Sequence, residues 1–255
     1  MLNKVYSFTI QNLKKILQSF GYSFYKINRD SISLRNTMLE SLYHLNRLGF
    51  QPSTIIDVGT ANGTFPLLKV FPSSNFLWIE PLSEFEPDLI KLKQKYKGDY
   101  LIAAAGKYDG SIDINVHEDL VGSSLLHESD GTKADGLKRA VRMVKLDSLY
   151  EKDNLSDNIL LKIDVQGTEL DVLEGAEKLI NKCEVILLEV SFLKFLGTNP
   201  EFFDVIFYMK QKGFVVYDIV EGINRPLDFA LAQKDIVFVK EFGQFRQSHG
   251  WSQPV

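Results

Sequence analysis

Two carboxylates and one histidine in the central part of the chain could accept a proton. Asp164 lies near the end of one apolar run, and Glu189 directly follows another. Open α/β sheets bind ligands at the carboxyl ends of their strands. We therefore expect both carboxylates to face one pocket, as ligands of a substrate hydroxyl, as a general base, or as metal ligands with water. His127 lies in a polar stretch and could act as a base when that stretch closes, since the usual pKa of histidine is about 6.5.

These groups also have simpler explanations. Lys162 precedes Asp164 by two positions, which puts both side chains on the same side of a strand, so they could form a buried structural pair. The ammonium would favour the ionised Asp164 carboxylate, making it a positioned acceptor more than a strong base. His127 could be a solvated loop histidine. Two carboxylates without a nearby histidine do not identify a metal site, and we assign none.

A glycine-containing turn is the second chemical feature. Residues 54–63 read Thr-Ile-Ile-Asp-Val-Gly-Thr-Ala-Asn-Gly, an apolar run that passes through a turn into a helical pattern. Glycines let the backbone pass close to a ligand and offer it N–H groups. The Gly59-x-x-x-Gly63 spacing differs from the G-x-G-x-x-G of dinucleotide sites. With Asp57 as its acid it resembles motif I of class I S-adenosylmethionine (SAM) methyltransferases; the alternative is a turn that only needs positive φ at its glycines.

An acid follows at the distance expected of a ribose ligand. Glu80 ends the apolar run 75–80, 23 residues after Asp57, and one carboxylate can accept hydrogen bonds from two vicinal hydroxyls. The alternative is a solvent-exposed acid at a strand end. A ribose ligand alone does not separate NAD from SAM, whereas the turn spacing favours SAM. The predicted cofactor-binding residues are Asp57, Gly59, Thr60, Ala61, Asn62, Gly63, Glu80, Pro81 and Ala104.

The most specific segment is 159–176, which reads Ile-Leu-Leu-Lys-Ile-Asp-Val-Gln-Gly-Thr-Glu-Leu-Asp-Val-Leu-Glu-Gly-Ala. It resembles the FkbM family of SAM-dependent methyltransferases, in which a Lys-Ile-Asp-Val-Glu-Gly-x-Glu stretch enters a helix with a Leu-x-Gly-Ala end. The resemblance spans residues 52–241. Shorter matches occur in the family's order at 57–59, 71–72, 79–81, 122–125, 146–149, 188–190 and 235–239. The motif I resemblance implies that Asp57 binds the amino-acid end of SAM, directly or through water.

Two departures from the family's pattern affect these expectations. The family's first turn usually reads Asp-Val-Gly-Ala-Asn-x-Gly, whereas this chain has Thr60, Ala61 and Asn62, which moves the asparagine by one place. Gln166 replaces the usual glutamate, keeping hydrogen-bonding ability but losing a charge. If that glutamate were a catalytic base in the family, this chain would be impaired.

The resemblance implies in-line transfer of the SAM methyl group to an oxygen nucleophile, for which alignment supplies much of the rate. Asp164, Glu189 or His127 would remove the hydroxyl proton. We expect the acceptor to be a small molecule or glycan, with a sugar of a bacterial-type glycan as the first candidate. The alternatives are an NAD-dependent oxidoreductase on a similar sheet and a non-catalytic SAM-binding protein that retains the fold.

The elements that must position these residues alternate along the chain after residue 54. This alternation predicts an α/β fold with a mostly parallel seven-stranded sheet flanked by helices. The resemblance implies that this is a Rossmann-like class I methyltransferase fold. The predicted strands are 54–58, 75–80, 100–104, 159–165, 184–190, 214–219 and 235–240, and the predicted helices are 65–71, 83–97, 168–181 and 200–212. Thr168 is expected to cap its helix, with Glu169 and Asp171 complementing the helix's positive end. Residues 111–149 interrupt the alternation and read as a hairpin followed by a loop, where we expect a lid.

Composition limits the partners and the compartment. The 255 residues carry a net charge of −4, and residues 1–50 contain seven basic against two acidic side chains, so the remainder carries −9. An acidic body argues against nucleic-acid binding, which needs a basic surface. The single cysteine, Cys183, excludes an internal disulfide and is expected to be a buried thiol. With no apolar run long enough to span a membrane and no signal peptide, we expect a cytoplasmic protein.

We divide the chain into an N-terminal helical extension (1–50), a methyltransferase domain (51–242) and a tail (243–255). Two amphipathic patterns in the extension, at 2–20 and 34–45, predict helices, the second ending at a left-handed Gly49. We expect them to pack on the catalytic domain or on a second subunit in a homodimer. The basic, aromatic residues 1–30 would also permit peripheral contact with an anionic membrane at the inner face.

Overall fold

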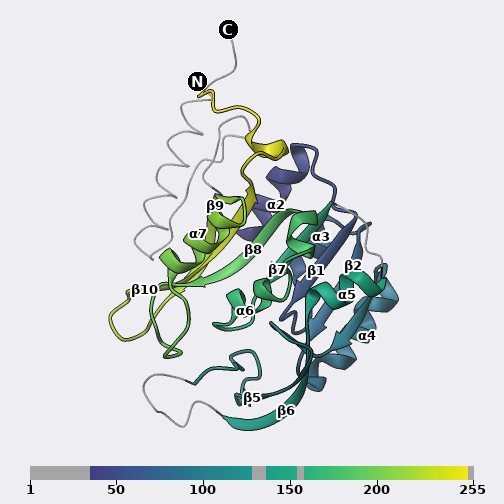
Figure 1. Cartoon of the computed structure of the whole chain (residues 1–255), viewed down its shortest axis with the longest axis vertical. Coiled ribbons are helices and arrows are strands. Elements are labelled where there is room, and N and C mark those ends of the chain that lie inside the picture. Colours follow the sequence, from purple (N-terminus) through teal and green to yellow (C-terminus); the bar gives the residue numbers. More distant parts are fainter. Residues whose placement is uncertain (1–34, 128–135, 154–157, 252–255) are drawn as a thin grey trace, which may run out of the picture. The chain divides into compact units, whose positions relative to one another are not determined.

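A layered α/β structure accounts for residues 35–127, 136–153 and 158–251, which a computed structural model describes. Its centre is a seven-stranded sheet (Figure 1). In sheet order the strands are β3 (Gly98–Ile102), β2 (Asn75–Glu80), β1 (Thr54–Val58), β7 (Ile159–Ile163), β8 (Cys183–Ser191), β10 (Leu231–Lys240) and β9 (Phe214–Asn224). All pairings are parallel except the two that involve β10. The predicted fold class is confirmed.

The middle strands are apolar because helices cover both of their faces. Every residue of β1 and β7 is buried, as expected of parallel strands inside an α/β protein. The helices on one face are α2 (Met38–Arg47), α3 (Phe65–Val70) and α4 (Glu86–Lys95), and those on the other are α5 (Leu146–Asp153), α6 (Glu169–Glu174) and α7 (Phe202–Gln211). Cys183 is fully buried in the second layer, as predicted.

A second, smaller sheet follows β3. Its order is β4 (Ala104–Ala105), β6 (Leu137–Val144) and β5 (Gly110–Val116), with β5 and β6 antiparallel. In Figure 1, β5 and β6 lie together at the lower end of the view. The hairpin prediction for 111–149 is confirmed, but the long loop lies between its two strands and not after them. The segment then ends in α5, a helix that the sequence pattern did not predict.

Several predicted element boundaries differ from those observed, among them the following three. The third strand ends at Ile102, so Ala104 belongs to the small sheet. The predicted helix 83–97 starts as a 3₁₀ turn, η1 (Ser83–Phe85), before α4 begins. The predicted helix 168–181 breaks after Glu174 and resumes as η3 (Leu179–Lys182). At the break Gly175 packs on another backbone: a Cβ there would lie 2.0 Å from the carbonyl oxygen of Gly106.

The chain's first 34 residues lie outside the described part, so the first predicted amphipathic helix and its membrane contact stay predictions. The second helix is α2, which begins with a capping box between Thr37 and Glu40 and is followed by Gly49 at φ +93°, as predicted. In the tail, η4 (Gln244–Arg246) is described. Among the described residues, no helix has both the length and the apolar character needed to cross a bilayer.

The residue Arg35, just before helix α2, is tied to strand β9, the edge of the main sheet, by a two-pronged ion pair. Arg35 donates from Nε and Nη2 to the two carboxylate oxygens of Asp218, at 2.6 Å each. Ser41 donates to the same carboxylate at 2.6 Å. Because this cluster is largely sheltered from solvent, it is worth more than an exposed pair of the same chemistry.

We expect Asp218→Asn to lower the free energy of unfolding by about 2 kcal/mol, because a charged acceptor of three hydrogen bonds is lost. Urea denaturation followed by circular dichroism measures it. The matched control is Asp228→Asn, which removes an exposed pair of the same two-pronged form with Arg225 and should change stability less. Equal losses of unfolding free energy in the two variants would contradict a larger contribution from the sheltered Arg35–Asp218 pair.

Candidate functional site

A row of six charged side chains crosses the main sheet at the carboxyl ends of its parallel strands. Side chains alternate faces along a strand, and all six occupy positions that face the α2–α3 layer, directly beyond its buried apolar residues. Strand β10 contributes through its first half because it runs antiparallel. The members of this polar row are Glu80 (β2), Asp57 (β1), Lys162 and Asp164 (β7 and its end), Glu189 (β8) and Asp235 (β10).

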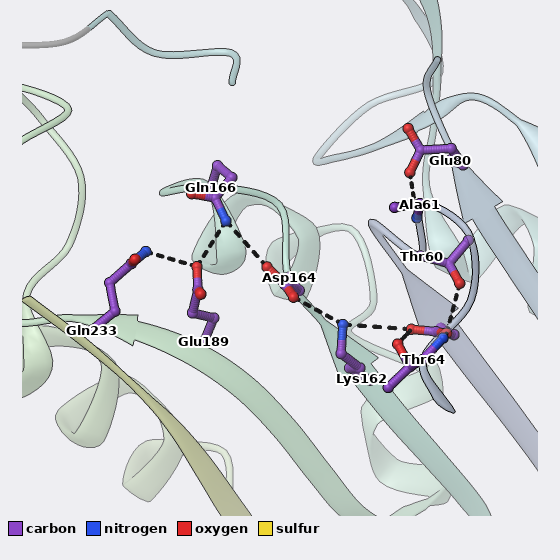
Figure 2. Close-up of polar contacts among 10 residues, drawn as sticks. Thr60, Ala61, Thr64, Glu80, Lys162, Asp164, Gln166, Glu189 and Gln233 are labelled. Atoms are coloured by element: carbon purple, nitrogen blue, oxygen red, sulfur yellow. Dashed lines mark hydrogen bonds and ion pairs between the residues drawn. The ribbon is translucent and has the colours of Figure 1, made fainter. Parts of the chain in front are cut away.

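Lys162 is the one cation of the polar row. Its Nζ lies 3.0 Å from Oδ2 of Asp164 and 3.6 Å from Oδ1 of Asp57, and its side chain is 7% exposed. Burial disfavours its charge, but the adjacent Asp164 and Asp57 carboxylates outweigh burial and raise the pKa of Lys162. The two carboxylates therefore share one permanently charged partner, as Figure 2 shows for the contact with Asp164.

Asp57 holds the glycine turn in place. Its carboxylate accepts a hydrogen bond from the Thr60 hydroxyl at 2.7 Å and from both the backbone N–H and the hydroxyl of Thr64, at 3.3 and 3.1 Å. The Asp57 side chain is 1% exposed. With these donors and Lys162 around it, Asp57 shapes the turn from beneath.

Gly59 and Ala61 give the turn its path. Gly59 has φ +68°, and a Cβ on it would lie 1.8 Å from the carbonyl oxygen of Asp164, so only glycine lets the turn approach the end of β7. Ala61 has φ +47° and donates its N–H to Oε2 of Glu80 at 2.9 Å. The turn is thus fixed to its two neighbouring strands.

A cavity opens above this turn, which we call the turn cavity. Of the predicted cofactor residues, those on its wall are Gly59, Thr60, Ala61, Glu80, Pro81 and Ala104. Asp57 and Gly63 lie outside the lining, and Asn62 is exposed and also outside it. Leu120, Val121, Ser123 and Leu125 of the β5–β6 connection, where a lid was expected, also line the cavity.

Glu80 is a buried acceptor on the wall of the turn cavity. It receives the N–H of Ala61 on one oxygen and that of Leu82 on the other, at 2.9 and 3.0 Å. Burial raises the pKa of Glu80, while these two backbone hydrogen bonds oppose the rise. Each oxygen keeps a further lone pair for a hydroxyl in the cavity.

A second cavity, the acidic cavity, adjoins the first and shares Thr64, Lys162 and Asp164 with it. Its polar wall consists of Lys162, Asp164, Glu189, Glu221, Lys234 and Asp235. The predicted pair Asp164 and Glu189 therefore faces one pocket. Phe65, which is exposed at the start of α3, lies at its rim.

Gln166 links the two carboxylates of the acidic cavity. Its side-chain amide donates to Oδ1 of Asp164 at 3.3 Å and to Oε2 of Glu189 at 2.9 Å (Figure 2). Gln233 donates to the same Glu189 oxygen at 2.7 Å. Gln166 has φ +56°, and its carbonyl accepts from the buried hydroxyl of Ser124. The amide that replaces the family's usual glutamate thus serves as a donor between two acids.

Burial and mutual repulsion make the acids of the cavity hard to ionise. Glu189 and Asp235 are directly opposite each other on β8 and β10. Burial first, then the Asp164 and Asp235 charges, raises the pKa of Glu189 to about 8. Burial and Asp164 likewise raise the pKa of Asp235 to about 7. Groups with such pKa values can exchange protons near neutral pH.

The structure does not bring His127 to either cavity. It is exposed at the edge of the described part of the β5–β6 connection and lines neither wall. Its role as a base stays a prediction that would need the connection to move. Among the described residues, no group of three or more His, Cys, Asp and Glu side chains is arranged to hold a metal ion.

The helix-cap prediction for Thr168 is wrong. Thr168 stands at the N-cap position of α6, but its hydroxyl makes no capping hydrogen bond. Glu169 instead accepts the N–H of Gly167 at 2.9 Å, and it is buried, which raises its pKa to about 7. Asp171 pairs with Lys107 at 3.3 Å on the surface.

The sequence patterns missed three charged residues of the acidic cavity, Glu221, Lys234 and Asp235, and also Gln233, which donates to Glu189. Asp235 opens an apolar run, the position usually farthest from the ligand edge of a sheet. It reaches that edge because β10 is antiparallel, which a run of apolar residues does not indicate. The sequence feature that could have indicated this site residue is an acid at the start of the last apolar run.

Comparison with known proteins adds a family match. The family model described as "Methyltransferase FkbM domain" matches residues 57–216. A search of curated proteins finds no match.

Similar solved structures include a putative RNA methyltransferase from Pyrococcus horikoshii, with 16% identity, TM-score 0.42, and coverage of 79% of this chain and 82% of that one. Another is magnesium protoporphyrin IX methyltransferase from Synechocystis PCC 6803 with bound SAM, with 8% identity, TM-score 0.41, and coverage of 86% and 87%. At these TM-scores the likeness carries no argument about substrate.

The buried acids predict a stability that falls as pH rises. The pKa of Glu169, Glu189 and Asp235 is raised in the folded state to about 7, 8 and 7, so the folded protein binds their protons more tightly than the unfolded chain. Their stabilising contribution is complete below their ordinary pKa values near 4 and is lost as pH rises towards 8. Urea unfolding of Glu169→Gln between pH 5 and about 8.5 should show a shallower decline, by at most about 3 kcal/mol across the range. A decline as steep as that of the unmodified chain would contradict the Glu169 assignment.

Proposed function

The chain belongs to the FkbM family of methyltransferases, since the family model covers more than half of it, and from this we propose that it methylates a hydroxyl oxygen of a sugar, glycan or related small metabolite. The family is SAM-dependent, so SAM is the cofactor and the chain is a methyltransferase. This favours the predicted activity over the NAD-dependent alternative. The choice of oxygen and the class of acceptor are our proposals.

The turn cavity fits SAM by the chemistry of its donors and acceptors. Glu80 would hold the ribose hydroxyls with its remaining lone pairs, and the backbone of Gly59, Thr60 and Ala61 would pass beside the amino-acid end. Asp57 would act through the turn that it shapes. SAM supplies an electrophilic methyl group on a sulfonium.

The observation that carries the acceptor proposal is the acidic cavity beside the turn cavity. Its wall has four carboxylates, on Asp164, Glu189, Glu221 and Asp235, against the two ammonium groups of Lys162 and Lys234. Carboxyl groups form hydrogen bonds with neighbouring hydroxyls, and Glu189 and Asp235, whose pKa values are raised to about 8 and 7, can donate as well as accept near neutral pH. A bound anion would add to the repulsion that already disfavours their ionisation. A neutral, hydroxyl-rich molecule fits this wall better than a polyanion, consistent with the expected absence of nucleic acid.

Proton removal is assigned to Glu189. Asp164 is held by Lys162 and Gln166 and is better suited to orient the acceptor hydroxyl. Glu189 has a pKa raised to about 8, so its carboxylate is a stronger base than an ordinary glutamate. The hydroxyl proton would pass to Glu189 as the oxygen attacks the methyl carbon.

Cofactor binding can be tested through Glu80. We expect Glu80→Gln to lower SAM affinity by about tenfold to a hundredfold in calorimetric titration, because one acceptor becomes a donor facing the N–H groups and hydroxyls that it must bind. Glu84→Gln is the matched control, since Glu84 lies nearby but outside the cavity and pairs with Arg139. Unchanged affinity in a folded Glu80→Gln protein would remove Glu80 from the site.

Catalysis can be tested through Glu189. In a tritiated-methyl transfer assay over neutral sugars, amino sugars and sugar phosphates, we expect a neutral hydroxyl-rich acceptor to be methylated, with a rate that rises with pH through about 8 as Glu189 loses its proton. Glu189→Gln should lower kcat by roughly 10²–10⁴ and leave SAM affinity unchanged. Glu184→Gln, at the other end of β8, is the control.

Two outcomes would contradict this assignment. One is a Glu189→Gln enzyme with the unmodified pH profile, and the other is a preference for phosphorylated acceptors. If the chain binds SAM but transfers the methyl group to none of the acceptors, the alternative of a non-catalytic SAM-binding protein would be favoured.

The proposed location and assembly rest on the sequence. We propose a cytoplasmic enzyme whose residues 1–30 touch an anionic membrane or a second subunit. Co-sedimentation with anionic liposomes should decrease when residues 1–30 are removed, and equal sedimentation would contradict the membrane contact.

A further inference from the structure

One hydroxyl on the wall of the turn cavity has no partner. Thr168 is 7% exposed, lines the turn cavity, and its Oγ1 is buried without a hydrogen bond. Among the described residues, four buried side-chain polar atoms lack a partner, and the other three, on Trp78, Tyr208 and Arg246, belong to residues outside this wall. The cavity therefore contains one polar group that the protein itself leaves unused.

The neighbouring polar groups of the wall are all engaged. Thr60 donates its hydroxyl to Asp57, the Ser123 hydroxyl accepts the backbone N–H of His117, and both oxygens of Glu80 accept backbone N–H groups. A buried hydroxyl without a hydrogen bond destabilises the folded state. Such a group in a native protein calls for an explanation, and a functional role is one.

The Thr168 hydroxyl does not cap helix α6. Threonine at an N-cap normally accepts an N–H of the first helical turn, and at α6 the Thr168 side chain makes no such bond. Glu169 meets the N–H of Gly167 instead. The Thr168 hydroxyl is thus left without a partner among the described residues.

We propose that Thr168 is a cofactor-binding residue, whose hydroxyl forms a hydrogen bond with a polar atom of bound SAM. The proposal rests on the proposed function, because it requires that the turn cavity hold SAM. Thr168, at the start of α6, would add a contact from the segment after β7 to those from the ends of β1 and β2.

The test compares binding and folding in the full-length chain with Thr168→Val, which removes the hydroxyl but keeps the side-chain shape. We expect calorimetric titration to show about tenfold weaker binding of SAM and of its demethylated product S-adenosylhomocysteine. Without ligand, the melting temperature should stay the same or rise, because the hydroxyl has no partner to lose. Thr168→Ser, which keeps the hydroxyl, should bind within about threefold of the unmodified chain.

Thr60→Val is the matched contrast, since its hydroxyl has a partner in Asp57 and its loss should lower the melting temperature without ligand. A Thr168→Val protein that binds both ligands as the unmodified chain does would overturn the proposal. So would a lower melting temperature with unchanged affinity, which would make the hydroxyl structural. If the unmodified chain bound neither ligand, the proposed function would fail before the Thr168 comparison was reached.

Discussion

The buried ammonium of Lys162 is the interaction on which the rest of the site depends. It lies between Asp57, which organises the glycine turn, and Asp164, which lies between the two cavities. Both carboxylates contact one shared cation, whose side chain is 7% exposed. The positions of the glycine turn and of Asp164 therefore depend on the same ammonium group.

The two sides of the polar row differ in the groups that they place at the strand ends. On the β2 side, the Glu80 carboxylate and the backbone of the glycine turn form one wall of the turn cavity. On the β8 and β10 side, Glu189 and Asp235 face each other as acids with raised pKa values. Asp164 and Lys162 belong to both cavities, which suits an enzyme that must bring a methyl donor and its acceptor together.

Local patterns predicted most of this arrangement. The apolar runs and their order were enough for the parallel strands, and hence for the meeting of Asp164 with Glu189. Other features depend on tertiary contacts that a linear pattern does not contain. Helix 168–181 breaks because Gly175 packs on Gly106, Asp235 reaches the site because β10 is antiparallel, and Asp57 turns inward because two threonines and a lysine surround it.

The central claim is that the polar row organises a SAM-binding site beside an acceptor pocket. Calorimetric titration of the purified chain with SAM, with S-adenosylhomocysteine and with NADH tests it most directly. The account predicts saturable binding of SAM and of S-adenosylhomocysteine in competition with each other, and no binding of NADH. Binding of NADH without binding of either sulfur compound would contradict it.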